Sequence, residues 1–254
     1  MSKRKVNVLK RNSMIIFILF LMFIGGFYIY QRTHHHVNRY YSDFGIRIPK
    51  DYSIHGIDVS RYQKNISWKE VKKMKSNNIK IGFAFMKATE GTDRIDRHYN
   101  ENWVNVKQAG ITRGAYHFFN AHSSGKTQAE NFIQNVFLTS GDLPPVLDIE
   151  NTDGVSTNEL QINIKEWLTI IEQHYKVKPI IYTYADFYAA NLSVGFDEYP
   201  LWIAHYVNSN KPRINRNWHF WQHNETGRVN GINAPVDFNV FNGDSAAFKN
   251  LLMN

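Results

Sequence analysis

Residues 144–150, Pro-Pro-Val-Leu-Asp-Ile-Glu, form an apolar run that ends in two carboxylates two positions apart. In a β-strand alternate side chains share a face, so Asp148 and Glu150 would project the same way, about 7 Å apart. Repulsion between like charges raises the pKa of one member of such a pair. A protonated acid beside an ionised neighbour is what cleavage of a glycosidic bond requires. A strand that runs into a solvated acidic turn would give the same pattern.

The elements that must position this pair begin near residue 52. Short apolar strands alternate there with amphipathic helical segments, and the last three strands follow one another closely. This order predicts an α/β fold, a closed barrel with an irregular last third, rather than a doubly wound sheet, because no Gly-rich phosphate loop follows the first strand. The eight predicted strands are Gly56–Val59, Ile81–Lys87, Gly114–Phe119, Val146–Glu150, Ile180–Tyr184, Leu201–Ala204, His219–Gln222 and Val236–Val240.

Polar residues gather at the predicted strand ends, where barrels of this kind carry their active sites. Three strands supply carboxylates: Asp58 on the first, Asp148 and Glu150 on the fourth, and Asp237 on the eighth. Ionised neighbours would hold a proton on one acid near neutral pH, and aromatic faces would support sugar rings. Ordinary barrel packing is the alternative for each aromatic side chain. The other candidates are Lys87, Tyr116, Tyr182, Trp202, Tyr206 and Gln222.

The N-terminal fifth of the chain has a different character. Residues 1–50 hold nine Lys and Arg and one Asp, whereas residues 51–254 hold 21 basic and 21 acidic residues. A basic segment (1–13) precedes 17 residues without charge (14–30), which as a helix would span about 26 Å. We interpret 14–30 as a transmembrane signal anchor with the N-terminus in the cytoplasm, and 31–51 as a linker. A cleaved signal peptide followed by secretion is the alternative.

Composition and motif searches exclude several classes of function. The basic residues that set the net charge of +8 lie in the N-terminal segment, so a nucleic-acid partner is not expected. The chain has no cysteine, which suits an exported protein without disulfides. His219 and His223 would stand about 13 Å apart on a strand, too far for one zinc ion. We therefore predict no metal and no cofactor.

The motifs, taken in chain order, resemble those of the family 25 glycoside hydrolases, the Chalaropsis-type lysozymes. They cover nearly all of residues 52–254 and are specific as a set. They are His-Gly-Ile-Asp-Val-Ser at 55–60, Phe-Met-Lys-Ala-Thr-Glu-Gly at 85–91, Gly-Ala-Tyr-His-Phe at 114–118, Val-Leu-Asp-Ile-Glu at 146–150, Leu-Trp-Ile-Ala-His-Tyr at 201–206, Trp-Gln at 221–222 and Val-Asp-Phe-Asn at 236–239.

The resemblance implies a (β/α)5β3 TIM-like barrel over 52–254 and hydrolysis of the β-1,4 bond between N-acetylmuramic acid and N-acetylglucosamine in peptidoglycan, with retention of configuration. By matched position Glu150 is the general acid, and Asp148 orients the N-acetyl group or stabilises charge. Asp58 and Asp237 match the other acidic positions, and the six remaining candidates match substrate contacts. A monomer is expected. The rival interpretations are a glycan-binding barrel without catalysis and a chitinase-like hydrolase.

Overall fold

The computed structural model describes residues 18–26, 38–207 and 209–254, and residues 38–254 form one compact unit. Eight strands close into a barrel in the order β3, β5, β7, β8, β9, β10, β11, β12, with β3 and β5 hydrogen-bonded to complete the ring. Neighbours from β3 to β11 run parallel, and β12 is antiparallel to both β11 and β3. The predicted closed barrel is confirmed.

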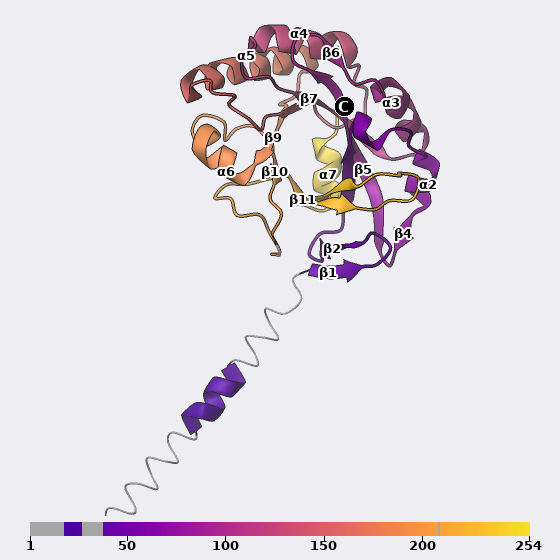
Figure 1. Cartoon of the computed structure of the whole chain (residues 1–254), viewed down its shortest axis with the longest axis vertical. Helices are drawn as coiled ribbons and strands as arrows, with labels where there is room; N and C mark the ends of the chain where they lie inside the picture. The colour runs from indigo at the N-terminus through magenta and orange to yellow at the C-terminus, as the bar shows by residue number, and fades with distance from the viewer. Residues whose placement is uncertain (1–17, 27–37, 208) are drawn as a thin grey trace, which may run out of the picture. The chain divides into compact units, whose positions relative to one another are not determined.

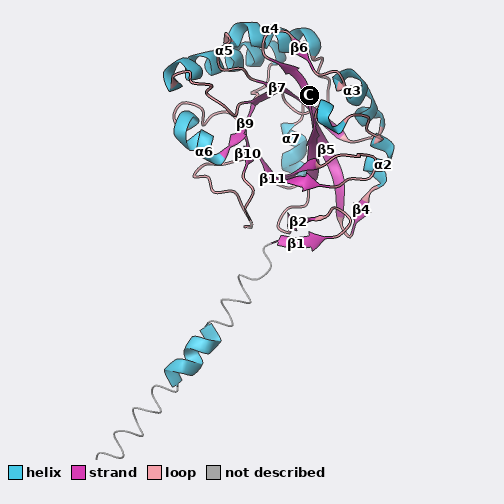
Figure 2. Cartoon of the chain, viewed as in Figure 1, coloured by secondary structure: helices cyan, strands magenta, loops and turns pink. Residues whose placement is uncertain are grey.

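Helices cover the outside of the barrel along the first five strands, and the later strands follow without long helices between them (Figure 1, Figure 2). The barrel strands are β3 (His55–Val59), β5 (Ile79–Glu90), β7 (Thr112–Phe118), β8 (Val146–Asp148), β9 (Ile180–Tyr184), β10 (Leu201–Ala204), β11 (Phe220–Gly227) and β12 (Val236–Phe241). The helices of the unit 38–254 are α2 (Trp68–Lys73), α3 (Tyr99–Gln108), α4 (Gly125–Asn135), α5 (Thr157–Tyr175), α6 (Ala185–Phe187) and α7 (Ser245–Leu251). Shorter elements are β4 (Lys75–Ser76), β6 (Arg94–Ile95), η1 (Arg61–Gln63) and η2 (Tyr188–Leu192).

Aromatic side chains fill the barrel interior. Phe83 and Phe85 on β5 stand edge to face, and Phe85 stacks on Trp202 with ring centroids 4.4 Å apart. Gly56 makes room for them, because a Cβ at this position would lie 2.4 Å from the Phe83 ring. Phe248 on α7 also packs on Phe83, with the ring centroids 5.7 Å apart. These rings belong to one buried apolar cluster, which also contains Phe220 and Phe241.

A hairpin of β1 (Asn38–Tyr41) and β2 (Ile46–Pro49) also belongs to the barrel unit. Phe44 at its turn is fully buried, and its ring meets that of Phe238 at 5.2 Å. Gly45 adopts a φ of +70° at the turn, which glycine tolerates without steric cost. Residues 38–49 thus cover barrel strands that lack a helix, whereas the sequence alone predicts a linker over 31–51.

Replacing Phe44 with alanine tests whether this hairpin stabilises the barrel. Because the ring is fully buried, we expect Phe44→Ala to lower the free energy of unfolding in urea by about 3–5 kcal/mol. Tyr40 lies on the same hairpin and is 55% exposed, so Tyr40→Ala should change it by less than about 0.5 kcal/mol. Equal effects of the two changes would contradict the packing described here.

The predicted membrane anchor falls mostly outside the described residues. Residues 18–26 are helical, and the rest of segments 1–13 and 14–30 is not described. Within the described part of the chain, no helix combines the length and apolar character needed to cross a bilayer.

Candidate active site

All ten side chains predicted from the sequence line one pocket of about 250 Å³ at one end of the barrel. Every barrel strand supplies at least one of them, either from the strand itself or from the two residues that follow it. Asp237 lies at the start of β12 rather than at its end, because this strand alone is antiparallel. In order they are Asp58 (β3), Lys87 (β5), Tyr116 (β7), Asp148 and Glu150 (β8), Tyr182 (β9), Trp202 and Tyr206 (β10), Gln222 (β11) and Asp237 (β12).

Asp148 and Glu150 face the pocket from the end of β8. The strand ends at Asp148, but the Ile149 amide still donates to the Tyr182 carbonyl at 3.0 Å, so the backbone stays extended. Alternate residues of an extended segment share a face, and both carboxyl groups therefore line the same pocket. Asp148 is only 6% exposed, whereas Glu150 is half-buried. Of the two acids, Glu150 is the one that an incoming ligand can reach.

The surroundings of these two acids favour their neutral forms. Burial raises the pKa of Asp148 well above its ordinary value, and the neighbouring Glu150 acts in the same direction. Burial also raises the pKa of Glu150, while the Tyr182 hydroxyl and the Lys87 ammonium oppose that shift. Asp148 Oδ1 has no hydrogen-bond partner among the described residues. Both pKa shifts favour the protonated carboxyl groups, and one buried oxygen of Asp148 remains open as an acceptor among the described residues.

Asp58 and Asp237 form a second carboxyl pair, on two adjacent strands. They stand directly opposite each other in the antiparallel ladder between β3 and β12. Burial raises the pKa of both groups, and the charge of Asp58 raises that of Asp237 further. Two carboxyl groups in contact share one proton, because ionising both would place two like charges together. The pocket thus has two acidic pairs, each able to hold a proton.

Buried amides bind the Asp58 carboxylate. Asn239 Nδ2 donates to Asp58 Oδ2 at 2.7 Å, and Gln222 Nε2 donates to the same oxygen at 2.9 Å. Gln222 in turn accepts from the hydroxyls of Tyr182 at 2.8 Å and Tyr206 at 2.7 Å. Four of the predicted residues therefore form one hydrogen-bonded chain rather than separate contacts.

Trp202 is buried, and its ring is not exposed as a platform for a sugar. Its side chain is 1% exposed and lies between Phe85 and Tyr182. Its indole Nε1 donates to Asn239 Oδ1 at 2.8 Å. Only a small edge of the ring remains for the pocket, so ordinary barrel packing describes most of its surface.

Lys87 is held by partners that sequence reasoning did not single out. Its Nζ lies 2.6 Å from Glu90 Oε2 and 4.3 Å from the centre of the Phe118 ring. Arg94 binds the other Glu90 oxygen at 2.7 Å. Lys87 lowers the pKa of Asp148 and of Glu150, but burial of the two carboxyl groups has the larger and opposite effect.

Four residues that the sequence analysis did not select also line the pocket, namely Ser60, Tyr62, Phe118 and Glu225. Period-two alternation points to Ser60, two residues after Asp58, and to Phe118, two residues after Tyr116. No comparable signal exists for the other two, since Tyr62 lies on η1 and Glu225 follows a register shift in β11.

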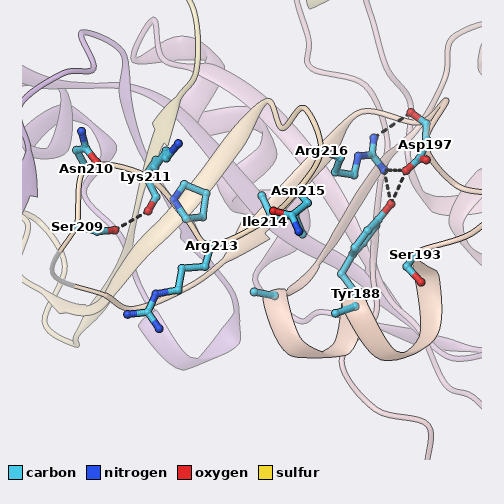
Figure 3. A pocket seen from close by; sticks show the side chains of 13 residues that line it. Tyr188, Ser193, Asp197, Ser209, Asn210, Lys211, Arg213, Ile214, Asn215 and Arg216 are labelled. Carbon is cyan, nitrogen blue, oxygen red and sulfur yellow. Dashed lines mark hydrogen bonds and ion pairs between the residues drawn. The ribbon is translucent and has the colours of Figure 1, made fainter.

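A larger pocket, of about 720 Å³, lies between α6, η2 and the connection from β10 to β11 (Figure 3). Its main polar group is Arg216, which is fully engaged: it donates to the Tyr188 hydroxyl at 2.9 Å and to backbone carbonyls of 196, 197 and 199. Asp197 completes the cluster by accepting from Tyr188 at 2.8 Å. These contacts tie the loop to η2, and the pocket contains no pair of acids suited to glycosidic cleavage.

Comparisons with known proteins agree with this geometry. The model of glycosyl hydrolases family 25 matches residues 57–232. Lysozyme M1 of Streptomyces globisporus is 37% identical over 228 residues, covering 81% of this chain and 74% of that protein. The uncharacterized protein YegX of Escherichia coli K12 is 47% identical over 210 residues, covering 83% of this chain and 77% of that protein. The structure of a family 25 glycosyl hydrolase from Bacillus anthracis superposes with a TM-score of 0.73 at 32% identity, covering 85% of this chain and 97% of that one. The chain is a glycoside hydrolase and belongs to family 25.

Proposed function

We propose that this protein is an N-acetylmuramidase, which hydrolyses the β-1,4 bond between N-acetylmuramic acid and N-acetylglucosamine in peptidoglycan. The observation that carries the proposal is the pairing of a reachable acid, Glu150, with a buried one, Asp148, whose Oδ1 is left without a partner. The lysozymes among its relatives support the choice of substrate. Glu150 is the general acid in this proposal, and Asp148 is its anionic partner.

Substrate binding would place the proton where the reaction needs it. In the free enzyme, burial favours the neutral form of Asp148. An acetamido N–H that donates to Asp148 Oδ1 stabilises the anion, and the shared proton then moves to Glu150. Glu150 passes it to the leaving oxygen as the glycosidic bond breaks, and a water molecule later supplies the hydroxyl and returns the proton.

The open acceptor on Asp148 supports substrate assistance over a covalent carboxylate intermediate. An anion that binds the acetamido N–H also increases the electron density on the acetamido oxygen, which can then attack the anomeric carbon. Retention of configuration follows from either route, because each displaces the same carbon twice. Proton NMR of the first product formed, before mutarotation, would show the β-anomer, and an α-anomer would contradict retention.

Mass spectrometry of fragments released from purified peptidoglycan tests the substrate assignment. Muramidase products end in reducing N-acetylmuramic acid, whereas cleavage of the other glycosidic bond leaves reducing N-acetylglucosamine. A glycan-binding barrel without catalysis would bind the polymer and release no reducing ends. A chitinase-like hydrolase would release soluble fragments from chitin faster than from peptidoglycan.

We also propose that residues 14–30 anchor the barrel outside the cytoplasmic membrane. The support is the sequence itself, with five basic residues before a stretch of 17 residues without charge. Mass spectrometry of the protein extracted from membranes should find an intact N-terminus. A mature chain that starts near residue 31 would instead establish cleavage and secretion.

A further inference from the structure

We propose that Asn239 and Gln222 are positioning residues that keep Asp58 ionised and its neighbour Asp237 protonated. The proposal rests on the muramidase function in one respect only, that an anion at Asp58 serves catalysis. The location of the proton is a separate property, which is measurable without any turnover.

The orientation of the Asn239 amide is fixed from outside the carboxyl pair. The Asn239 side chain is fully buried, and its Oδ1 accepts the indole N–H of Trp202 at 2.8 Å. An indole nitrogen only donates, so the amide oxygen must face Trp202. Nδ2 is therefore turned towards Asp58 Oδ2, which it meets at 2.7 Å. The flipped amide would set its oxygen against the carboxylate and its NH2 group against the indole N–H.

Gln222, which is paired with Asn239 in the ladder between β11 and β12, presents its amide nitrogen to the same carboxylate. It is 3% exposed, and its Oε1 accepts from Tyr206 at 2.7 Å and from Tyr182 at 2.8 Å. The single hydrogen of the Tyr182 hydroxyl lies within reach of both Gln222 and Glu150, whereas the Tyr206 hydroxyl donates to the Gln222 amide oxygen in either case. Gln222 Nε2 then donates to Asp58 Oδ2 at 2.9 Å. Two oriented N–H groups thus converge on one carboxylate oxygen.

This asymmetry decides which acid of the pair holds the shared proton. Hydrogen bonds to a carboxylate favour its charged form, so the two amides lower the pKa of Asp58 against the effect of its burial. No amide of the described residues donates to Asp237, and burial together with the Asp58 charge raises its pKa. Asp237 is therefore the neutral partner and donates its hydrogen to Asp58.

The other groups around Asp58 do not reproduce this asymmetry. The nearby acids on β8 repel an anion at either member of the pair, and Glu225 acts on Asp237. Lys87 on β5 pairs with Glu90 instead of Asp58. The titratable groups that face Asp58 are Asp237 from β12, Asp148 and Glu150 from the end of β8, Tyr116 from β7, Tyr182 from β9 and Tyr206 from the β10–β11 connection.

Carboxyl ¹³C NMR titration of the full chain measures the proton directly. We would record it in a Glu150→Gln background, where loss of activity does not matter. Near neutral pH the Asp58 carbon should show the ionised shift and the Asp237 carbon the neutral one. A neutral Asp58, or two ionised groups, would overturn the proposal even if the protein proves to be a muramidase.

Two changes at Asn239 separate the amide's role from its volume. Asn239→Leu keeps the approximate volume of the side chain but loses the donor, and Asn239→Ala loses both the donor and the volume. In both we expect the lower apparent pKa of the pair to rise by about one unit, the size of one hydrogen bond to a charged group. An unchanged titration in folded protein of either variant would contradict a positioning role.

The same variants, made in protein that retains Glu150, give the pH dependence of kcat/KM. If ionised Asp58 is needed, the acid limb of kcat/KM moves up by about one pH unit with the NMR value. Thr183→Val is the matched control, because Thr183 is equally buried in β9 and its hydroxyl has no partner among the described residues. It should leave both the titration and the profile unchanged. A shifted titration with an unshifted profile would keep the proton placement and refute the need for the Asp58 anion.

Discussion

Glu150→Gln should lower kcat on peptidoglycan by about 10²–10⁴-fold and leave the fold intact. The range is that of a lost general acid, and glutamine keeps the size of the side chain while removing the proton that the leaving oxygen requires. Glu150 is half-buried at the rim, so the neutral amide adds no buried charge. Turbidity loss of a wall suspension and release of reducing ends would both report the change.

The matched control for this variant is Glu101→Gln on the exposed surface of α3. It removes one carboxylate from the protein without touching the pocket, and its lysis rate should equal that of the parent. Thermal unfolding of Glu150→Gln should stay within a few degrees of the parent. A folded variant that still clears the suspension at the parental rate would show that another group is the acid.

The sequence was sufficient to predict the barrel and the residues that line its pocket, because both depend on short-range periodicity. Alternation with period two places every second residue of a strand on the interior face, and a closed barrel gathers the strand ends at one rim. Asp58, Lys87 and Tyr116 come together for this reason alone. The pocket shows that these side chains lie together but does not test what each one does, so the individual roles remain predictions.

The hydrogen bonds within the site could not be predicted in this way. The contact of Asn239 with Asp58 depends on the register between β12 and β3, which places Asp237 opposite Asp58. Nothing in the local sequence sets that register, and a shift by one residue would turn Asn239 out of the barrel. The shielding of Trp202 by Phe85 depends likewise on side chains far apart in the chain.

The hairpin was within reach of sequence reasoning. Ile46 and Ile48 alternate with Arg47, and Gly45 precedes them at a turn, which is the usual signal for a hairpin strand. The surrounding polar residues and the nearby apolar segment favoured a linker over this short pattern. What the sequence could not supply is the uncovered side of the barrel against which Phe44 packs.

Asp148→Asn separates the two roles open to Asp148. Asparagine keeps an oxygen that can accept the acetamido N–H but loses the charge, so a residue that only orients the substrate would retain most of its activity. We expect kcat to fall by about 10²–10³-fold with KM little changed, the usual loss of one group that stabilises developing charge. Steady-state kinetics on a soluble peptidoglycan oligosaccharide would measure both constants. Asp148→Leu should be slower than Asp148→Asn, since leucine lacks the acceptor for the acetamido N–H as well as the anion.

The pH profile of Asp148→Asn gives a second and independent result. The coupling between Asp148 and Glu150 is reciprocal, so an ionised Asp148 in the substrate complex disfavours loss of the proton from Glu150. Removing that charge lowers the pKa of Glu150, and the basic limb of kcat should therefore move to lower pH. A merely structural loss would reduce kcat at every pH and leave the limb in place. A basic limb that stays in place while kcat falls would mean that Asp148 does not share its proton with Glu150.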